Sequence, residues 1–473
     1  MKITLTSHLD ITGAPDPLLR KIRDAFTIEN PRWVDNNRMS RWNGATDHWL
    51  TFYENHPGGL MIPRGAMGLI LFFCKEMGVR YQIIDKRRTL PERDFTFAGI
   101  LKGYQQSVTA DILSRDFGVL QAPTGSGKTI MALAIIAARR QPCLIIVHSK
   151  ELMDQWIERI GKFLEIPEAE IGVIGNGKRQ AGEKITVGIV NSVYPAAKEL
   201  KEHIGNLVID ECHRCPSRTF IDAVTAFDCQ FMLGLSATPY RRDGLTKLIG
   251  WHLGRKFEVK QADLTETDII LDVEVVRRDT MFTSCYDASE EYTRVLSELT
   301  EDAARNQLIA RDVIREATNG GGICLVLTDR REHCSALAAL ISSSVIEVAI
   351  LTGDVSNGSR KTIVELLNAG SIKVLVATGQ LIGEGFDCKE LSTLFLATPI
   401  KFDGRLTQYL GRVLRPAPGK DKAKVYDYCD VHVGVLAASA RSRQQVYRKI
   451  DGEMGAKEFS KLKGDFRAWE TGK

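Results

Sequence analysis

The sequence lacks any apolar run long enough to cross a membrane. Its most apolar stretch covers only residues 69–74, whereas a membrane-spanning helix needs about 20 apolar residues. Residues 1–4 also lack the apolar segment that a signal peptide requires. These two absences predict a soluble protein located in the cytoplasm.

A regular framework of cysteines is also absent. The ten cysteines are scattered along the chain, which favours free thiols in a reducing compartment over disulfide bonds. Cys212 and Cys215 form one CxxC pair, but no second pair stands at the spacing of a zinc site. A metal site is therefore the less favoured interpretation of this pair.

Strong charge of one sign is missing too, because the formal net charge is only +4. The distribution is uneven: residues 1–96 carry a net charge of +3 and residues 436–473 carry +4, which leaves about −3 for the middle. No global basic field indicates nucleic acid, but the two mildly basic ends suit contact with phosphates.

Short apolar runs that alternate with helical patterns dominate the chain after residue 97. Such runs, each followed by glycine or polar residues and then a helix, are typical of buried parallel strands in βαβ units. The pattern pauses near residues 240–300 and then resumes. The predicted strands lie at residues 118–121, 143–147, 185–190, 207–209, 231–235, 323–327, 346–351, 373–377, 393–397 and 424–427.

This pattern predicts an α/β protein with two parallel-sheet lobes in tandem, preceded by a small α+β domain with an apolar helix at residues 63–77. The expected parts are an N-terminal accessory domain (1–96), a first lobe (97–260), a connector (261–299), a second lobe (300–435) and a basic helical C-terminal tail (436–473).

A phosphate-binding loop is predicted between the first strand of the first lobe and the helix after it. Gly127, Lys128 and Thr129 fit the end of the G-x-x-x-x-G-K-[ST] pattern, although Ala122 stands where that pattern starts with glycine. Lys128 would reach the β- and γ-phosphates of a nucleotide, and Thr129 would hold Mg²⁺. A plain glycine-rich turn is the alternative. The expected nucleotide contacts are Pro123, Thr124, Gly125, Ser126, Gly127, Lys128 and Thr129.

Two carboxylates, Asp210 and Glu211, directly follow the apolar run at residues 207–209. An apolar strand that ends in two acids places them at its carboxyl edge, beside the phosphate loop. There Asp210 can hold Mg²⁺, and Glu211 can orient and deprotonate the attacking water. An ordinary solvated strand end is the alternative, but the position about 80 residues after a phosphate loop favours the catalytic interpretation.

Two arginines in the second lobe complete the predicted catalytic set. Arg412 and Arg415 stand three residues apart and therefore share one face of a helix. Across a cleft from the first lobe they could neutralise charge that develops on the γ-phosphate. For an isolated pair of arginines, a solvated basic face would be the alternative.

Taken in this order, the three elements resemble the motifs of superfamily 2 helicases. The residues Asp210, Glu211, Cys212 and His213 resemble the second motif of the DEAD/DEAH-type group in its DECH form. The resemblance covers about residues 100–430. It implies two RecA-like lobes, ATP and Mg²⁺ as cofactors, and hydrolysis of ATP to ADP and phosphate.

The resemblance adds further site residues in the first lobe. Tyr104 and Gln105 resemble the adenine-reading element, in which Gln105 would contact the base. Ser236, Ala237 and Thr238 resemble the motif that couples hydrolysis to lobe movement.

In the second lobe, residues 377–387 resemble the motif that contacts both ATP and the nucleic-acid backbone. There the resemblance implies a phosphate contact for Thr378 and places Gly385 and Asp387 at the nucleotide. In the arginine motif it implies that Gln408 acts beside the two arginines.

Residues 238–244 resemble the ATPxRxDG stretch of DNA-directed members of the superfamily. These members include XPB-like repair helicases, phage UvsW-like helicases and restriction-enzyme motor subunits. We therefore expect an ATP-dependent DNA helicase or translocase that unwinds, remodels or anneals DNA. The alternatives are an RNA helicase, an inactive ATP-gated scaffold, and the motor subunit of a defence or restriction assembly with a partner such as a nuclease or a repair factor.

Polar residues that follow successive strands are the candidates for contacting nucleic-acid phosphates. Ligands bind at the carboxyl ends of strands in open α/β sheets, and small polar groups suit phosphates without reading sequence. Each residue alone also fits an ordinary turn or helix cap. The candidates are His148, Lys150, Asn191, Ser192, Arg330, Thr352 and, from the resemblance, Thr378.

Three tryptophans gather in the N-terminal domain: Trp33, Trp42 and Trp49. With nearby arginines they could stack on nucleobases and touch phosphates. The favoured interpretation is that they fill a small core, since large aromatic side chains are usually well buried.

Overall fold

The computed structural model divides into two compact units, Met1–Asp263 and the part that begins at Leu264. Each unit is described by itself below. The described residues are 1–450 except Thr124, 215–217, 238–244, 260–271, Ser289, Gly321, Val345, 380–387, Lys389, 401–405, 407–408, 411–412, 414–419 and Asp421. Within them, no helix is both long and apolar enough to cross a membrane.

The N-terminal domain is a five-stranded sheet covered by two helices. The strand order is β5 (Glu54–His56), β6 (Gly59–Pro63), β2 (His8–Thr12), β1 (Lys2–Leu5) and β7 (Gln82–Asp85). The helices α1 (Asp16–Ala25) and α3 (Met67–Glu76) pack on it through buried side chains such as Ile22 and Ile70. The turn Arg64–Ala66 together with α3 matches the predicted apolar helix.

One helix of the first lobe, α9 (Lys247–Leu253), belongs to two cores. Leu248 and Trp251 join the core of the N-terminal domain, whereas Ile249 and Leu253 join a core of the first lobe. Gly65 lies so close to this helix that a Cβ atom there would stand 2.6 Å from the carbonyl oxygen of Gly250. Through α9 the N-terminal domain therefore packs tightly against the first lobe.

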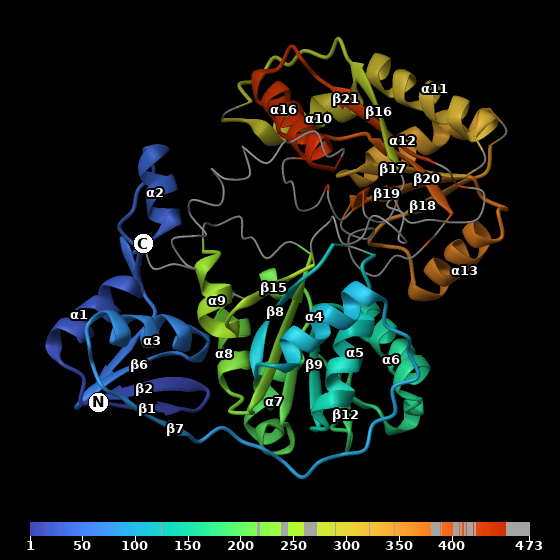
Figure 1. Cartoon of the computed structure of the whole chain (residues 1–473). Coiled ribbons are helices and arrows are strands. Elements are labelled where there is room, and N and C mark those ends of the chain that lie inside the picture. The colour runs from blue at the N-terminus through green and yellow to red at the C-terminus, as the bar shows by residue number, and fades with distance from the viewer. Residues whose placement is uncertain are drawn as a thin grey trace. The chain divides into compact units, whose positions relative to one another are not determined.

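Residues 27–51 form a separate excursion from the N-terminal domain. The helix α2 (Pro31–Arg38) has no buried residue and stands away from the five-stranded sheet (Figure 1), next to the two-stranded sheet of β3 (Thr27–Glu29) and β4 (Trp49–Thr51). Trp42 is 81% exposed and Trp49 is 55% exposed. The favoured interpretation of these tryptophans was therefore wrong, because none of the three belongs to the buried core of the domain.

The first lobe is an eight-stranded sheet in which the five predicted strands are present and parallel. Helices α4, α5 and α6 lie on one face, and α7, α8 and α9 cover the other (Figure 1). The strands, in spatial order, are β11 (Lys178–Gln180), β10 (Gly172–Gly175), β12 (Ile185–Ile189), β9 (Cys143–Val147), β13 (Asn206–Ile209), β14 (Phe231–Ser236), β8 (Phe117–Gln121) and β15 (Lys256–Glu258). The helices are α4 (Gly103–Leu113), α5 (Lys128–Arg139), α6 (Lys150–Leu164), α7 (Val190–Leu200), α8 (Arg218–Thr225) and α9.

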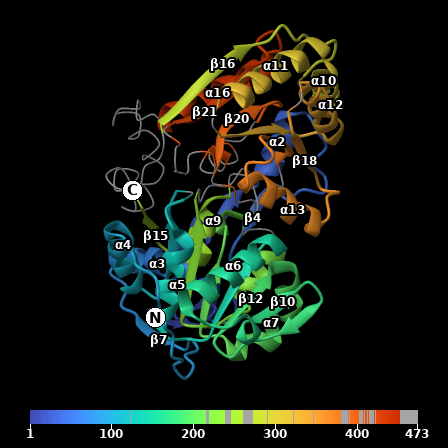
Figure 2. The same ribbon diagram turned by 90° about the vertical axis from the view of Figure 1, so that its right-hand side faces the viewer.

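The second lobe is a six-stranded parallel sheet that also contains its five predicted strands. Its spatial order is β16 (Asp272–Asp279), β21 (Lys422–Cys429), β20 (Leu391–Leu396), β17 (Ile323–Thr328), β19 (Val374–Thr378) and β18 (Val348–Leu351). The edge strand β16 runs along β21 (Figure 2) and lies inside the predicted connector. Its sequence, Asp-Val-Glu-Val-Val-Arg-Arg-Asp, alternates weakly and carries five charges, so it lacks the continuous apolar run of a central strand.

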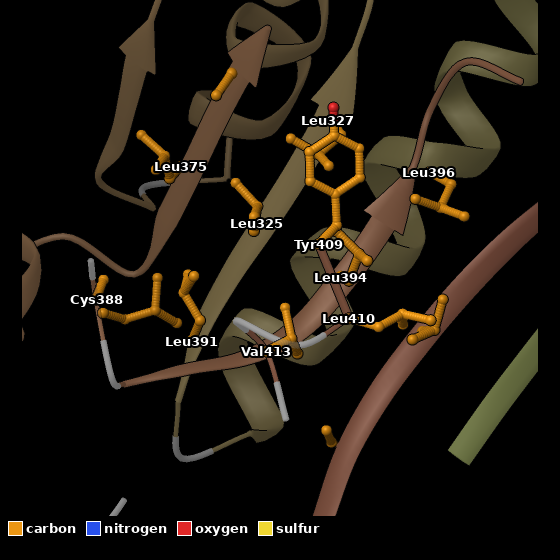
Figure 3. Packing of buried hydrophobic residues seen from close by; sticks show 14 of the residues in the cluster. Leu325, Leu327, Leu375, Cys388, Leu391, Leu394, Leu396, Tyr409, Leu410 and Val413 are labelled. Carbon is orange, nitrogen blue, oxygen red and sulfur yellow. The ribbon is translucent and has the colours of Figure 1, made fainter. Parts of the chain in front are cut away.

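Both faces of this second sheet carry helices. On one face α11 (Ala303–Asn319) and α12 (Arg331–Ser342) pack on residues such as Cys324 and Val326. The opposite core holds Leu325, Leu375 and Leu394 of three strands together with Tyr409 and Leu410 (Figure 3). Within the described residues of this unit, the other helices are α10 (Tyr292–Glu301), α13 (Asn357–Asn368) and α16 (Gly434–Ile450).

A buried ion pair fixes the end of β21 to α11. Arg305 and Asp430 are both about 1% exposed, with 2.8 Å between Nε and Oδ1. Arg305 also donates to the carbonyl oxygen of Ala397 at 2.6 Å, and Thr280 donates its hydroxyl to Asp430 at 2.6 Å. Every charged oxygen and nitrogen at this position therefore has a nearby partner, as burial of charge requires.

We expect Asp430→Ala to lower the free energy of unfolding by about 3–5 kcal/mol, because it leaves the Arg305 guanidinium buried without its counter-charge. Asp354→Ala is the matched control, since Asp354 and Arg331 form an exposed pair, and should change the free energy by less than about 0.5 kcal/mol. Urea denaturation followed by circular dichroism measures both, and equal losses would contradict this assignment.

Candidate functional site

The predicted catalytic residues of the first lobe lie at one edge of its sheet. The strands β13, β14 and β8 are neighbours and parallel, so their carboxyl ends point the same way. Asp210 and Glu211 follow β13, Ser236 ends β14, and the phosphate loop follows β8. The loop is tied to this edge, because the N–H of Ala122 donates to the carbonyl oxygen of Ser236 at 3.1 Å.

Two glycines give the phosphate loop its shape. Gly125 has φ +89° and Gly127 has φ +82°, which is the left-handed region that residues with a Cβ atom rarely adopt. Gly127 is the N-cap residue of α5, so the helix starts directly after the turn. The buried Ser126 donates its hydroxyl to the carbonyl oxygen of Pro123 at 2.7 Å, which closes the loop on itself.

Tyr104 and Gln105, at the start of α4, hold this loop from outside. The hydroxyl of Tyr104 donates to the carbonyl oxygen of Ser126 at 3.0 Å, and the amide of Gln105 donates to the same oxygen at 2.9 Å. The amide oxygen of Gln105 accepts from the N–H of Lys102 at 2.9 Å. Both ends of the buried Gln105 amide are therefore bonded within the protein, which places Gln105 at the loop itself.

Lys128, the first residue of α5, points its ammonium group back into the loop. Its Nζ lies 2.9 Å from the carbonyl oxygen of Ala122 and 3.2 Å from that of Pro123. The loop thus gathers a cation, a helix N-terminus and two flexible glycine positions at one place, which together favour a phosphate ligand.

The carboxylate of Asp210 is engaged at both oxygens. Its Oδ1 accepts from the N–H of Glu211 at 2.9 Å, and its Oδ2 accepts from the indole Nε1 of Trp156 at 2.8 Å. Burial, followed by the neighbouring Glu211 carboxylate, raises the pKa of Asp210 to about 6. Lys128 and the two hydrogen bonds act against this rise, since each favours the charged carboxylate.

Glu211 has a backbone conformation that is unusual for its residue type. Its φ is +48°, and non-glycine residues in the left-handed region are often found at functional sites. His213 lies 3.2 Å from the Glu211 carboxylate through Nδ1 and 3.1 Å from the Ser236 hydroxyl through the same atom. The second motif and the end of β14 are therefore in direct contact, and Ala237 follows Ser236 as a buried residue.

Two residues of α6 that the sequence analysis did not single out also reach this site. Trp156 is nearly buried and contacts Asp210, as described above. Arg159 donates from Nη1 to the Thr129 hydroxyl at 2.8 Å. The only sequence signal for Trp156 is that a buried indole needs an acceptor for its N–H, and that requirement does not identify the acceptor.

The candidate nucleic-acid contacts lie at the carboxyl edges of their own sheets. In the first lobe, His148 directly follows β9 and Lys150 is the first residue of α6, while Asn191 and Ser192 lie in the first turn of α7. In the second lobe, Arg330, Thr352 and Thr378 lie at or just after the ends of β17, β18 and β19, which are adjacent in that sheet. The two sets belong to different compact units.

Seven predicted site residues lie outside the described residues, so their places are not described. These are Thr124, Thr238, Gly385, Asp387, Gln408, Arg412 and Arg415.

Two family models match the chain. Residues 99–241 match the model described as type III restriction enzyme, res subunit, and residues 305–417 match the model described as helicase conserved C-terminal domain. The two matched regions fall in the first and the second lobe, respectively.

The relatives that are similar to this chain include one named as an RNA helicase and one named as a DNA translocase. An African swine fever virus protein (tick isolate from Malawi), named as a candidate ATP-dependent RNA helicase, is 27% identical over 395 residues, which cover 76% of this chain and 75% of that protein. The DNA 3′–5′ translocase XPB2 of Sulfurisphaera tokodaii is 35% identical over 177 residues, which cover 37% of this chain and 39% of that protein.

Among solved structures, a fragment of a candidate HsdR subunit of a type I restriction enzyme from Vibrio vulnificus is similar to this chain in fold. The TM-score is 0.56 at 17% identity, over 73% of this chain and 66% of that chain. At this level of identity the similarity concerns the arrangement of helices and strands.

Gly127→Ala should destabilise the protein more than Gly125→Ala. Both substitutions force a residue with a Cβ atom into the left-handed region, at about 1–2 kcal/mol each. At Gly127 the Cβ atom would also stand 2.5 Å from Nε2 of Gln105, whereas at Gly125 it would meet nothing within 4 Å.

Because Gln105 is bonded at both ends, it cannot shift without breaking its bond to Ser126. We therefore expect an additional loss of about 1–3 kcal/mol for Gly127→Ala. Urea denaturation without nucleotide measures the difference. Equal free energies of unfolding for the two variants would show that Gln105 does not brace the loop.

Proposed function

Since the chain belongs to the superfamily 2 helicases and is an ATP-dependent helicase, we propose that DNA is the polymer on which it acts. The observation that carries the enzymatic part is the meeting of Lys128, Asp210 and Glu211 at one sheet edge. We further propose that hydrolysis of ATP at this edge drives unwinding, branch remodelling or annealing of DNA.

The donor groups at this edge fit Mg²⁺. The Thr129 hydroxyl and the Asp210 carboxylate are hard oxygen ligands, which Mg²⁺ prefers, and each is oriented by a hydrogen bond from α6. We propose that these two residues hold the ion, which when bound neutralises charge on the phosphates.

The protein groups have separate tasks in this proposal. Lys128 leaves the carbonyl oxygens that it now contacts and binds the phosphates of ATP, whose charge is a stronger acceptor. Glu211 orients and deprotonates the attacking water. His213 bridges Glu211 and Ser236, so it links the water-activating group to the strand end that the resemblance assigns to coupling.

The choice of DNA over RNA is supported by two observations. The relative that is named as a DNA translocase is 35% identical over 177 residues, whereas the relative named as an RNA helicase is 27% identical over 395 residues. Residues 238–244 also resemble the corresponding stretch of DNA-directed superfamily members.

A second candidate function is the motor subunit of a restriction or defence assembly. The model that matches residues 99–241 carries the description of a restriction-enzyme subunit, and the HsdR fragment is similar in fold. In that case a partner subunit would cut DNA, and ATP hydrolysis would depend on the partner.

Steady-state ATP hydrolysis with single-stranded DNA, duplex DNA, forked DNA and single-stranded RNA at one salt concentration tests the proposal. We expect DNA to stimulate hydrolysis strongly and RNA to stimulate it little. Lys128→Ala and Glu211→Gln should each lower the stimulated rate by at least about 100-fold, because each removes charge stabilisation or water activation.

Stimulation by RNA alone would overturn the choice of DNA. No stimulation by any polymer would favour the assembly, and hydrolysis should then return when a partner is added. Near-normal turnover in Lys128→Ala would show that the nucleotide site lies elsewhere.

We also propose that the excursion of residues 27–51 contacts nucleic acid. Trp33 stacks on His48 with 3.8 Å between ring centroids, and His48 stacks on Trp49 with 4.8 Å between ring centroids. The three rings therefore form one continuous stack. Trp42 and the exposed Arg38 and Arg41 lie in the same excursion. Exposed aromatic faces together with arginines suit stacking on unpaired bases and contact with phosphates.

Trp42→Ala and Trp49→Ala should each weaken binding of single-stranded DNA about 5- to 100-fold, which corresponds to about 1–3 kcal/mol per stacked base. Tyr81→Ala is the matched control, because it removes an exposed aromatic residue beside β7 of the same domain. Fluorescence anisotropy of a labelled oligonucleotide measures the dissociation constants. Unchanged affinity in both tryptophan variants would refute this surface.

These point variants are preferable to removal of residues 1–95. Such a deletion would uncover Leu248 and Trp251, which α9 contributes to the core of the N-terminal domain, and would therefore damage the first lobe as well.

A further inference from the structure

Trp156 and Arg159 lie three residues apart in the middle of α6, and each touches a residue expected to hold Mg²⁺. We propose that both are positioning residues for the metal: Trp156 for the Asp210 carboxylate and Arg159 for the Thr129 hydroxyl. This inference rests on the proposed function, since it concerns the same nucleotide site.

The contact of Trp156 fixes how the Asp210 carboxylate is turned. A carboxylate that ends a strand can rotate about its Cβ–Cγ bond. Here one oxygen is held by the Glu211 N–H at 2.9 Å and the other by the indole N–H at 2.8 Å. With both oxygens held, the plane of the carboxylate is set, and each oxygen keeps further lone pairs for a water or an ion.

The surroundings of Trp156 make this contact rigid. Trp156 is about 2% exposed and lies on the buried face of α6 with Met153, Ile160 and Leu164. A packed indole has few accessible rotamers, so its N–H stays directed at Asp210. Groups that orient a metal ligand in this way commonly change metal affinity about 10- to 100-fold when they are removed.

The contact of Arg159 acts on the other expected ligand. Its Nη1 donates to the Thr129 hydroxyl at 2.8 Å. The hydroxyl oxygen has two lone pairs, so a bond to Arg159 occupies one and leaves the other for an ion. Thr129 lies in the first turn of α5, so Arg159 also bridges α6 to the helix that begins at the phosphate loop.

One helix thus holds both expected ligands, although they come from segments 81 positions apart in the sequence. Asp210 follows β13 and Thr129 belongs to α5. The separation between the two ligands is then set by the spacing of Trp156 and Arg159, which one turn of helix keeps constant. We infer that α6 determines how well the site fits the ion, with little effect on the nucleotide itself.

The test uses the full-length protein and binding of fluorescently labelled ADP, measured once with EDTA and once during titration with Mg²⁺. Trp156→Phe keeps an aromatic ring at this position but removes the indole N–H. The affinity for ADP in EDTA should stay within about twofold of wild type, while the Mg²⁺ concentration at half-maximal enhancement should rise about 10-fold. Trp251→Phe, which alters another buried tryptophan in the core of the N-terminal domain, should leave that concentration unchanged.

Arg159→Gln and Arg159→Lys test the second residue independently of the first. Arg159→Gln should raise the Mg²⁺ concentration at half-maximal enhancement severalfold. Arg159→Lys should keep this concentration close to the wild-type value, because an ammonium group can still donate to Thr129. A purely structural defect would change ADP binding in EDTA as well.

An unchanged Mg²⁺ midpoint in Trp156→Phe would overturn the role of Trp156. Tighter Mg²⁺ binding in Arg159→Gln would overturn the role of Arg159, since it would mean that the guanidinium competes with the ion. If wild-type protein fails to bind labelled ADP at all, the nucleotide site itself is refuted. That result contradicts the proposed function, whereas unchanged Mg²⁺ midpoints in the variants contradict only the roles of Trp156 and Arg159.

Discussion

The parallel pairing of β8, β14 and β13 is the constraint on which the rest of the first lobe depends. The register joins Leu233 to both Val208 and Gly118, so three strands from distant parts of the chain end within two residues of one another at one edge of the sheet. Because parallel strands carry their carboxyl ends to one edge, the phosphate loop, the two acids and Ser236 meet there without any direct sequence proximity. A shift of any of these strands would separate Lys128 from Asp210.

The helices around this edge supply the hydrogen bonds that hold the loop and the side chains at the strand ends in place. From one side α4 braces the loop through Tyr104 and Gln105, while α6 reaches Asp210 and Thr129. On the opposite face α9 joins the first lobe to the N-terminal domain through two cores. The exposed tryptophans therefore belong to a domain that is packed tightly against the lobe with the proposed nucleotide site.

Most of the fold could be predicted from the sequence because buried parallel strands are nearly continuous apolar runs. That signal located all ten predicted strands. It missed β10, β11 and β15 of the first lobe and β16 of the second, and the charged edge position of β16 leaves no such run. The phosphate loop and the acids of the second motif were identifiable because their chemistry needs fixed residue types at fixed spacing. Trp156 and Arg159 were missed because their partners are chosen by packing between distant segments, and Trp42 was misjudged because an excursion outside the core has no sequence signature of its own.

Strand displacement from forked DNA tests most directly whether the ATP site at this sheet edge drives movement along DNA. The measurement follows release of a labelled strand by wild-type protein and by Glu211→Gln, with ATP and with a non-hydrolysable analogue. We expect release only by wild-type protein and only with ATP, and weaker release from a matched RNA fork. ATP hydrolysis without release, equal release by Glu211→Gln, or release from RNA alone would contradict it.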